Sequence, residues 1–191
     1  MTETKQTSTD EIIKNHALLS MAAAAIPVPI ADIAAITLVQ LDMIKKLASH
    51  HSVNYDHEWG KSVVSSLTSS SLAVIASRFL ASGIKMIPGV GTILGIATQV
   101  VLAGATTYAL GRIFDEHFSG KEIIEPNLDM LKKKYEEYVE KGKKIVSEWK
   151  ESQTSQEDVY SELEKLSKLK EMGAISPEEF EEAKKKLLGK I

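Results

Sequence analysis

The stretch MIPGVGTILGIATQVVLAGATTYALG, residues 86–111, contains no charged side chain and lies between Lys85 and Arg112. About 20 apolar residues are enough for a helix to cross the hydrocarbon core of a bilayer. The same pattern is also typical of a helix that is buried on all sides at the centre of a bundle. In both cases the stretch predicts an α-helix that other elements or lipid must cover, and the surrounding sequence predicts an all-α fold.

Small residues mark the places where this helix can approach a neighbour. Gly91 and Gly95 form a G-x-x-x-G pair, and Gly104 follows nine positions later. Glycines at such spacing let two helix backbones come close together, which is the packing that is preferred in lipid. We therefore predict Gly91, Gly95 and Gly104 as helix-packing positions. The hydroxyl and amide side chains of the stretch each need a partner if lipid surrounds it: Thr92, Thr98, Gln99, Thr106 and Thr107.

The charges are distributed unevenly along the 191 residues. Residues 1–120 carry 17 charged side chains, whereas residues 121–191 carry 32. The absence of cysteine excludes disulfides, Cys-ligated zinc and thiol catalysis. A net charge of −3 argues against a nucleic-acid partner. The pattern predicts a lead-in (1–8), an apolar helical module (9–120), a heptad helix (121–151), a linker (152–156) and a C-terminal helical hairpin (157–191).

We expect four helices in the apolar module, arranged as two helical hairpins. Ser8 and Glu11 have the spacing of a capping box, so the first helix begins near Thr9. The Pro27 and Pro29 pair separates the first helix from a second that runs from about residue 30 to 50.

Asp32 falls in the first turn of that second helix, between two apolar stretches. There it suits the helix dipole if the hairpin is in water. If the 17–39 hairpin enters a membrane, an ionisable group at this place is costly, which makes Asp32 the candidate functional ionisable residue.

The charged tail begins with a heptad pattern. Its apolar or aromatic positions follow steps of 3 and 4: Leu128, Leu131, Tyr135, Tyr138, Gly142, Ile145 and Trp149. A seam this regular needs a partner helix, either in a second copy or in the apolar module. We predict that Leu128, Leu131, Tyr135, Tyr138, Ile145 and Trp149 form an oligomerisation seam.

The last residues have strong helix-boundary signals. Gly173 stops one amphipathic helix, and Ser176, Pro177 and Glu179 supply the N-cap, the first helical position and the capping box of the next. Together with the leucine spacing before Gly173 and with Leu187-Leu188, these residues resemble a SHOCT domain, a short C-terminal hairpin. The resemblance implies an appendage for oligomerisation or localisation, without catalytic residues.

A second resemblance covers residues 12–118. It rests on Ile13-Lys-Asn-His-Ala17, Ile26-Pro-Val-Pro-Ile-Ala-Asp-Ile33, Gln40-Leu-Asp-Met-Ile44, Ile87-Pro-Gly-Val-Gly91 and Tyr108-Ala-Leu-Gly111. These segments are similar to the GTPase-associated domain of unknown function of YcjF-like bacterial proteins. The resemblance implies a helical, membrane-associated module that works with a small GTPase. Because the chain has no G-x-x-x-x-G-K-[ST] loop, the GTPase has to be a separate protein.

Candidate catalytic and metal residues are weak. His50, His51 and His57 lie near Asp56 and Glu58, but they lack helical metal-ligand spacing, so a solvated loop is the favoured interpretation. His16 has no carboxylate placed to complete a triad and is interpreted as a packing residue. We therefore expect no catalytic residue, cofactor or metal.

These observations predict a non-enzymatic, self-associating scaffold or adaptor that is cytoplasmic and lies at the inner face of the cytoplasmic membrane or is inserted in it. The expected partners are itself, membrane lipid and a separate GTPase. The alternative is a soluble helical homo-oligomer, a closed particle or a filament, whose apolar helices are buried between subunits. An enzyme with a His/Asp loop site is a third, weaker class.

Overall fold

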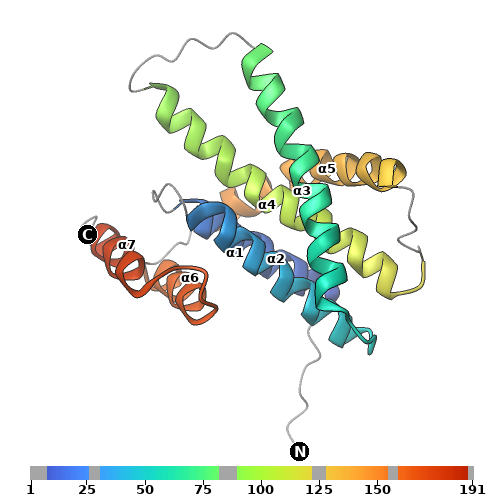
Figure 1. The fold of residues 1–191 in the computed structure, drawn as a ribbon. Coiled ribbons are helices and arrows are strands. Elements are labelled where there is room, and N and C mark those ends of the chain that lie inside the picture. Colours follow the sequence, from blue (N-terminus) through green and yellow to red (C-terminus); the bar gives the residue numbers. More distant parts are fainter. Residues whose placement is uncertain (1–7, 26–30, 82–89, 122–127, 155–158, 189–191) are drawn as a thin grey trace, which may run out of the picture.

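The computed structural model describes residues 8–25, 31–81, 90–121, 128–154 and 159–188. These ranges contain seven helices and no strand, which confirms the all-α fold (Figure 1). The helices are α1 (Thr9–Ala25), α2 (Ala31–His50), α3 (His57–Ala81), α4 (Val90–Phe118), α5 (Leu128–Thr154), α6 (Val159–Glu171) and α7 (Pro177–Leu188).

Capping residues set several of these boundaries. At the start of α1, the Glu11 amide donates to Ser8 Oγ (3.2 Å) and the Ser8 amide donates back to the Glu11 carboxylate (3.3 Å), which confirms the capping box. Helix α3 begins at His57 because Asp56 Oδ1 accepts hydrogen bonds from the backbone amides of Glu58 and Trp59, in the first turn of the helix. Helix α5 continues to Thr154, into the segment expected to be a linker.

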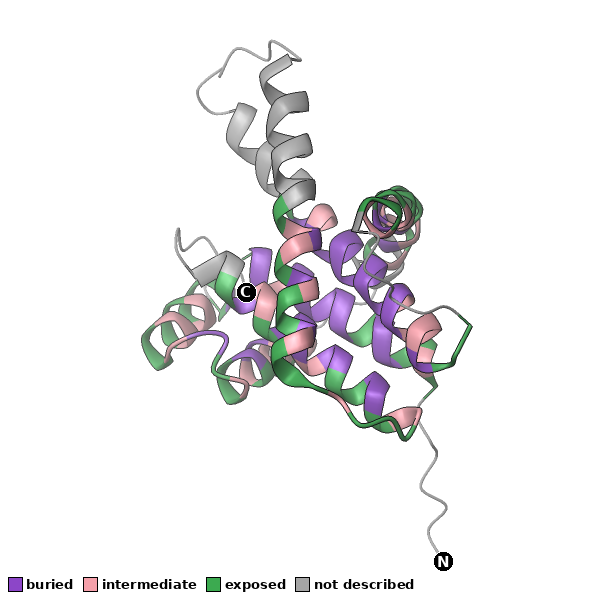
Figure 2. Ribbon diagram, turned by 45° about the vertical axis from the view of Figure 1, so that its right-hand side comes forward, coloured by how far each residue is buried: buried purple, intermediate pink, exposed green. Residues whose placement is uncertain are grey.

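Helix α4, the uncharged stretch and its continuation, is the central element of the fold. It packs most extensively against α1 and α5, and also against α2 (Figure 1). Residues 103–111 of α4 are all buried, and Figure 2 shows such buried positions gathered between the helices. The expected pair of hairpins is not confirmed, because the most extensive contact of α1 is with α4 and not with α2.

The polar side chains in the second half of the uncharged stretch have partners inside the protein. Thr107 Oγ1 donates to Ser20 Oγ of α1 (2.8 Å) and accepts from Gln40 Nε2 of α2 (3.2 Å). Thr106 Oγ1 donates to the Ala103 carbonyl (3.0 Å). Ser20, Gln40 and Thr107 are fully buried and Thr106 is 7% exposed, so the three hydroxyl groups find their partners within the protein. The Oε1 atom of Gln40 is buried without a hydrogen-bond partner among the described residues.

In the part of the chain that the structure describes, no helix has both the length and the hydropathy needed to cross a bilayer.

Close helix contact at α4 depends on glycine. A Cβ on Gly104 would lie 2.6 Å from Val146 Cγ1 of α5 and 2.7 Å from Met21 Cγ of α1. From the other side, a Cβ on Gly142 of α5 would lie 3.0 Å from the Ala105 carbonyl oxygen of α4. Gly104 therefore sits where α1, α4 and α5 meet. Gly91 lies in the first turn of α4, and Gly95 one turn later, but their packing lies outside what the structure describes.

The C-terminal hairpin forms a second, smaller core. Leu166, Leu169 and Leu187 of α6 and α7 are buried together with Leu19 and Val39 of α1 and α2. Helix α6 ends as expected at Gly173, which has a positive φ of 69° and allows the Ala174 amide to donate to the Leu169 carbonyl (2.8 Å). The Ser176 and Glu179 capping box of α7 is also present. The hairpin thus buries its apolar side against α1 and α2.

We predict that Gly104→Leu destabilises the protein by about 2 kcal/mol, because the added side chain has to displace Val146 and Met21 from a filled contact. Denaturant unfolding of the purified chain measures this. Glu136→Leu, at an exposed position of α5, is the matched control and should change the unfolding free energy by less than about 0.5 kcal/mol. Equal stability of Gly104→Leu and the unmodified chain would show that the helices do not meet there.

Candidate functional site

An open groove of about 800 Å³ separates the C-terminal hairpin from the two helices on which it is docked. One wall comes from α1 and α2 and the other from α6, with an apolar part formed by Ile12, Leu18, Leu19 and Met172. The polar lining consists of Asn15, His16, Lys46, Ser49, His50, Ser161, Glu164, Lys165, Lys168 and Glu171. The groove is the candidate functional site because it combines an apolar surface with ionisable groups.

His16 connects α1 to α2 beside this groove. Its Nδ1 lies 2.6 Å from the Ile12 carbonyl oxygen, and its Nε2 lies 3.0 Å from Asp42 Oδ2. Asp42 also pairs with Lys46 (2.7 Å), one turn further along α2. The three side chains form an ionic cluster, which we call the His16 cluster.

The geometry of the His16 cluster is that of a structural contact. A general base needs a ring nitrogen that can accept a proton from a substrate, whereas both nitrogens of His16 face oxygen acceptors. The nearby Ser20 hydroxyl accepts from Thr107. The sequence interpretation of His16 as a residue without a carboxylate partner is wrong, because Asp42 reaches it from the next helix. Its interpretation as a buried packing residue agrees with its 5% exposure.

The cluster strongly favours the ionised form of Asp42. The hydrogen bond from His16, followed by burial, which acts in the opposite direction, and by the bond from Lys46, lowers the pKa of Asp42 to about 2. This carboxylate therefore stays charged through the whole physiological range and holds α1 to α2.

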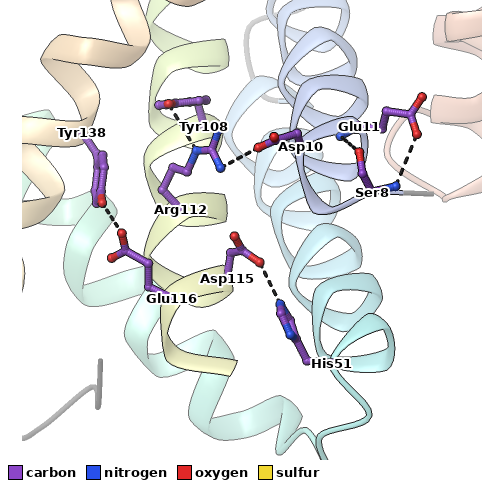
Figure 3. Close-up of polar contacts among 9 residues, drawn as sticks. All are labelled: Ser8, Asp10, Glu11, His51, Tyr108, Arg112, Asp115, Glu116 and Tyr138. Carbon is purple, nitrogen blue, oxygen red and sulfur yellow. Dashed lines mark hydrogen bonds and ion pairs between the residues drawn. The ribbon is translucent and has the colours of Figure 1, made fainter. Parts of the chain in front are cut away.

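The last turns of α4 bind three other elements (Figure 3). Arg112 Nη1 pairs with Asp10 of α1 (2.6 Å), and its Nε donates to Tyr108 (3.2 Å). Asp115 pairs with His51, in the loop after α2 (2.8 Å).

Glu116 of the same turns binds α5. It accepts from the Tyr138 hydroxyl and pairs with Lys134 (2.7 Å). Burial would raise the pKa of Glu116, but the bonds from Lys134 and Tyr138 outweigh it and lower the pKa. For Tyr138, burial and the bond to Glu116 raise the pKa to about 12. These contacts orient α1, α5 and the 51–56 loop around α4.

The histidine-rich loop has a structural explanation. His51 binds Asp115, Asp56 caps α3, and His117 of α4 lies against the Trp59 ring with centroids 5.3 Å apart. Burial lowers the pKa of His117. Within the described ranges, no group of three His, Asp or Glu side chains is placed to hold a metal ion.

The predicted oligomerisation seam faces α4 of its own chain. Tyr135 is 1% exposed and belongs to the main core, and Leu131, Tyr138, Ile145 and Trp149 are partly buried against it. The buried stripe of α5 also includes Val139, Gly142 and Val146, and of these three the heptad pattern contains only Gly142. Of the two partners left open, the structure therefore provides the apolar module. The side chain of Leu128 lies outside what is described.

Asp32 lies in the first turn of α2, as expected. Its side chain is outside the described residues, so its candidate role stays a prediction.

Two models of known protein families match the chain. The model of a domain of unknown function, DUF697, matches residues 1–144, and the model of the short C-terminal domain, SHOCT, matches residues 161–188. The chain therefore belongs to the DUF697 family and carries a C-terminal SHOCT domain, which confirms both resemblances and their order. Neither family description specifies an enzymatic activity.

The chain is also similar to a relative that has a name. Magnetosome membrane protein 22 of Magnetospirillum gryphiswaldense is 37% identical over 143 residues, which are 74% of this chain and 73% of the relative. No solved structure matches the chain.

We predict that Asp42→Asn removes the part of the folding stability that comes from the ionised carboxylate of Asp42. In the unmodified chain this part is complete above the ordinary pKa of 3.8 and is lost as the pH falls toward about 2, because the lowered pKa belongs to the folded state. The stability difference between the two proteins should be about 2 kcal/mol near neutral pH and should shrink below pH 3.8. Urea unfolding across pH measures it.

Asp129→Asn, at an exposed position of α5, is the control for loss of one negative charge and should show no such pH-dependent difference. A constant stability difference between Asp42→Asn and the unmodified chain at every pH would contradict the ionic role of Asp42.

Proposed function

We propose that this protein is a non-catalytic scaffold that associates with a membrane. Support comes first from the relative, which is named as a membrane protein and matches three quarters of the chain. It comes second from the ionisable groups that the structure describes. The His16 cluster and the contacts of Arg112, Asp115 and Glu116 each join one helix to another element, which is a structural use.

The observation that carries the proposal is the charge pattern of the first two helices. Asp32 is the single charged side chain between Ala17 and Leu41. This segment forms most of α1 and the first half of α2. Residues 17–24 of this segment are mostly buried in the protein, and the exposed side chains that the structure describes in it are apolar: Ala25, Ala34 and Leu38. An uncharged exposed surface of this kind is suited to the interfacial region of a bilayer, where apolar side chains enter the headgroup boundary without crossing the membrane.

Self-association is a second part of the proposal. Leu131, Tyr138, Ile145 and Trp149 are covered on one side by α4 and are still partly exposed on the other. Partly exposed aromatic and aliphatic side chains along one helix edge are typical anchors of protein interfaces. A second copy can cover this edge while the seam keeps its contact with α4. The same edge is the observation in favour of the alternative function, a soluble helical homo-oligomer.

A separate GTPase is a partner that the resemblance suggests. The contribution of this chain would be to hold that protein at the membrane, since its own sequence has no phosphate-binding loop.

Flotation with vesicles of equimolar phosphatidylcholine and phosphatidylglycerol, without detergent, tests the membrane proposal. We expect the unmodified chain to float. Asp32→Asn should raise the floated fraction several-fold, because it removes the one charge of the hairpin. Asp129→Asn is the matched control and should float like the unmodified chain. If the protein stays in the aqueous fraction as one defined large species, the soluble homo-oligomer replaces the membrane scaffold.

Light scattering after size exclusion tests the self-association edge. We expect Ile145→Lys to shift the protein from an oligomer to a monomer. The lysine would place a charge on the half-buried edge of α5, where the apolar surface of a second copy has to pack. Met130→Lys changes an exposed apolar residue of the same helix away from the seam, with 71% exposure, and is the control. A monomeric unmodified chain, or an Ile145→Lys oligomer of unchanged mass, would rule out this edge.

A further inference from the structure

The SHOCT hairpin covers an apolar surface on α1 and α2. On α1 and α2 the covered residues are Leu19, Ala23, Ala35 and Val39, with Ala22 and Ile36 partly buried beside them. We call these six residues the covered face. Across from it lie Leu166, Leu169, Ala174, Ile175 and Leu187 of the hairpin.

The covered face contains aliphatic and small side chains only. These six side chains carry no charge, and the partly buried ring of Phe180 from α7 packs against the same cluster. A surface of aliphatic and small side chains suits the headgroup boundary of a bilayer, where nearby cations add attraction to anionic lipids. Lys45 and Lys46 are exposed further along α2.

The contact between hairpin and module is limited. The 800 Å³ groove opens between them at one end of the contact, lined by Ser49 and His50 on one wall and by Ser161 on the other. In the described residues α6 is the helix of the hairpin that packs along the module, through α1 (Figure 1). The main core, by contrast, joins α1, α2, α3, α4 and α5 in one cluster.

Neither side of this contact is stable when exposed alone. A hairpin of about 30 residues is too small to bury a sufficient core without a partner. The covered face on α1 and α2 would expose a contiguous apolar surface if the hairpin left, and such surfaces bind something else.

We propose that the SHOCT hairpin is an intramolecular cover of a lipid-binding surface, and that its release lets the covered face of α1 and α2 enter the bilayer interface. This inference rests on the proposed membrane association and adds its regulation. In the closed state the hairpin occupies the site. Apparent affinity for vesicles is then reduced by the fraction of molecules that are open.

Two substitutions on opposite sides of the same contact test the cover. Ile175→Glu changes the hairpin side, in the turn between α6 and α7, and should release the hairpin while leaving the covered face intact. Ala23→Glu places a charge on the covered face itself. If about one molecule in ten is open, Ile175→Glu should bind vesicles about tenfold more tightly than the unmodified chain. Ala23→Glu should bind more weakly than the unmodified chain, although it also disrupts the contact.

A covalent lock tests the same proposal in a protein that keeps its core. The chain has no cysteine, so Ser49→Cys and Ser161→Cys, on the two walls of the groove, are the sole thiols of a double variant. Cross-linking with a bismaleimide that has a disulfide in its spacer should abolish binding to phosphatidylcholine and phosphatidylglycerol vesicles. Reduction of the spacer should restore it. Each single variant, treated alike, is the control for modification without a lock.

The outcomes separate the two proposals. Loss of binding on locking and its return on reduction supports the cover, as do the opposite effects of the two substitutions. Equal vesicle binding by the locked, reduced and Ile175→Glu proteins overturns the cover and leaves membrane association intact. Failure of every form to bind overturns both. If Ile175→Glu forms dimers in light scattering and gains no vesicle binding, a second copy is the competing occupant, and the lipid cover is wrong.

Discussion

The constraint on which the rest of the structure depends is the enclosure of α4. A helix with a long uncharged stretch cannot face water along its length, so α1, α2 and α5 surround its second half. Their backbones come close because Gly104 and Gly142 leave no side chain at the crossing. Thr107 then satisfies its hydroxyl with Ser20 and Gln40 of two different helices. These contacts fix the positions of α1 and α2, on which the groove, the His16 cluster and the covered face all lie.

Much of the architecture could be predicted from local signals. The capping boxes at Ser8 and Ser176 placed two helix starts, and Gly173 placed a helix end, because these residues act on their immediate neighbours. The start of α3 at His57 depends on the side chain of Asp56, which accepts from the amides of Glu58 and Trp59, and no prediction used this capping signal. The heptad steps identified α5 as a helix that needs a partner, but its buried stripe also uses Val139 and Val146. The heptad positions and the neighbouring valines form two adjacent stripes on α5, and the sequence alone does not tell which of the two is more deeply buried.

The candidate site was harder to predict because it is made by long-range contacts. The His16 and Asp42 pair could have been anticipated, since the two residues lie 12 and 14 positions on either side of Val28, in the middle of the break between α1 and α2. In an antiparallel helix pair, residues at similar distances from the turn face each other. No comparable rule pairs Thr107 with Ser20, or brings the hairpin onto Leu19 and Val39. Those contacts depend on how separate elements pack.

The second half of the uncharged stretch lies in the protein interior, and we propose that α1 and α2, and not α4, make the contact with lipid. Hydrogen exchange of the full chain in buffer without detergent or lipid, read on peptides that cover residues 100–118, tests it most directly. We expect the amides of residues 100–118 to exchange among the slowest of the molecule, because they open only with the main core. Fast exchange of residues 100–118 in water, with protection only after vesicles are added, would show instead that lipid encloses α4.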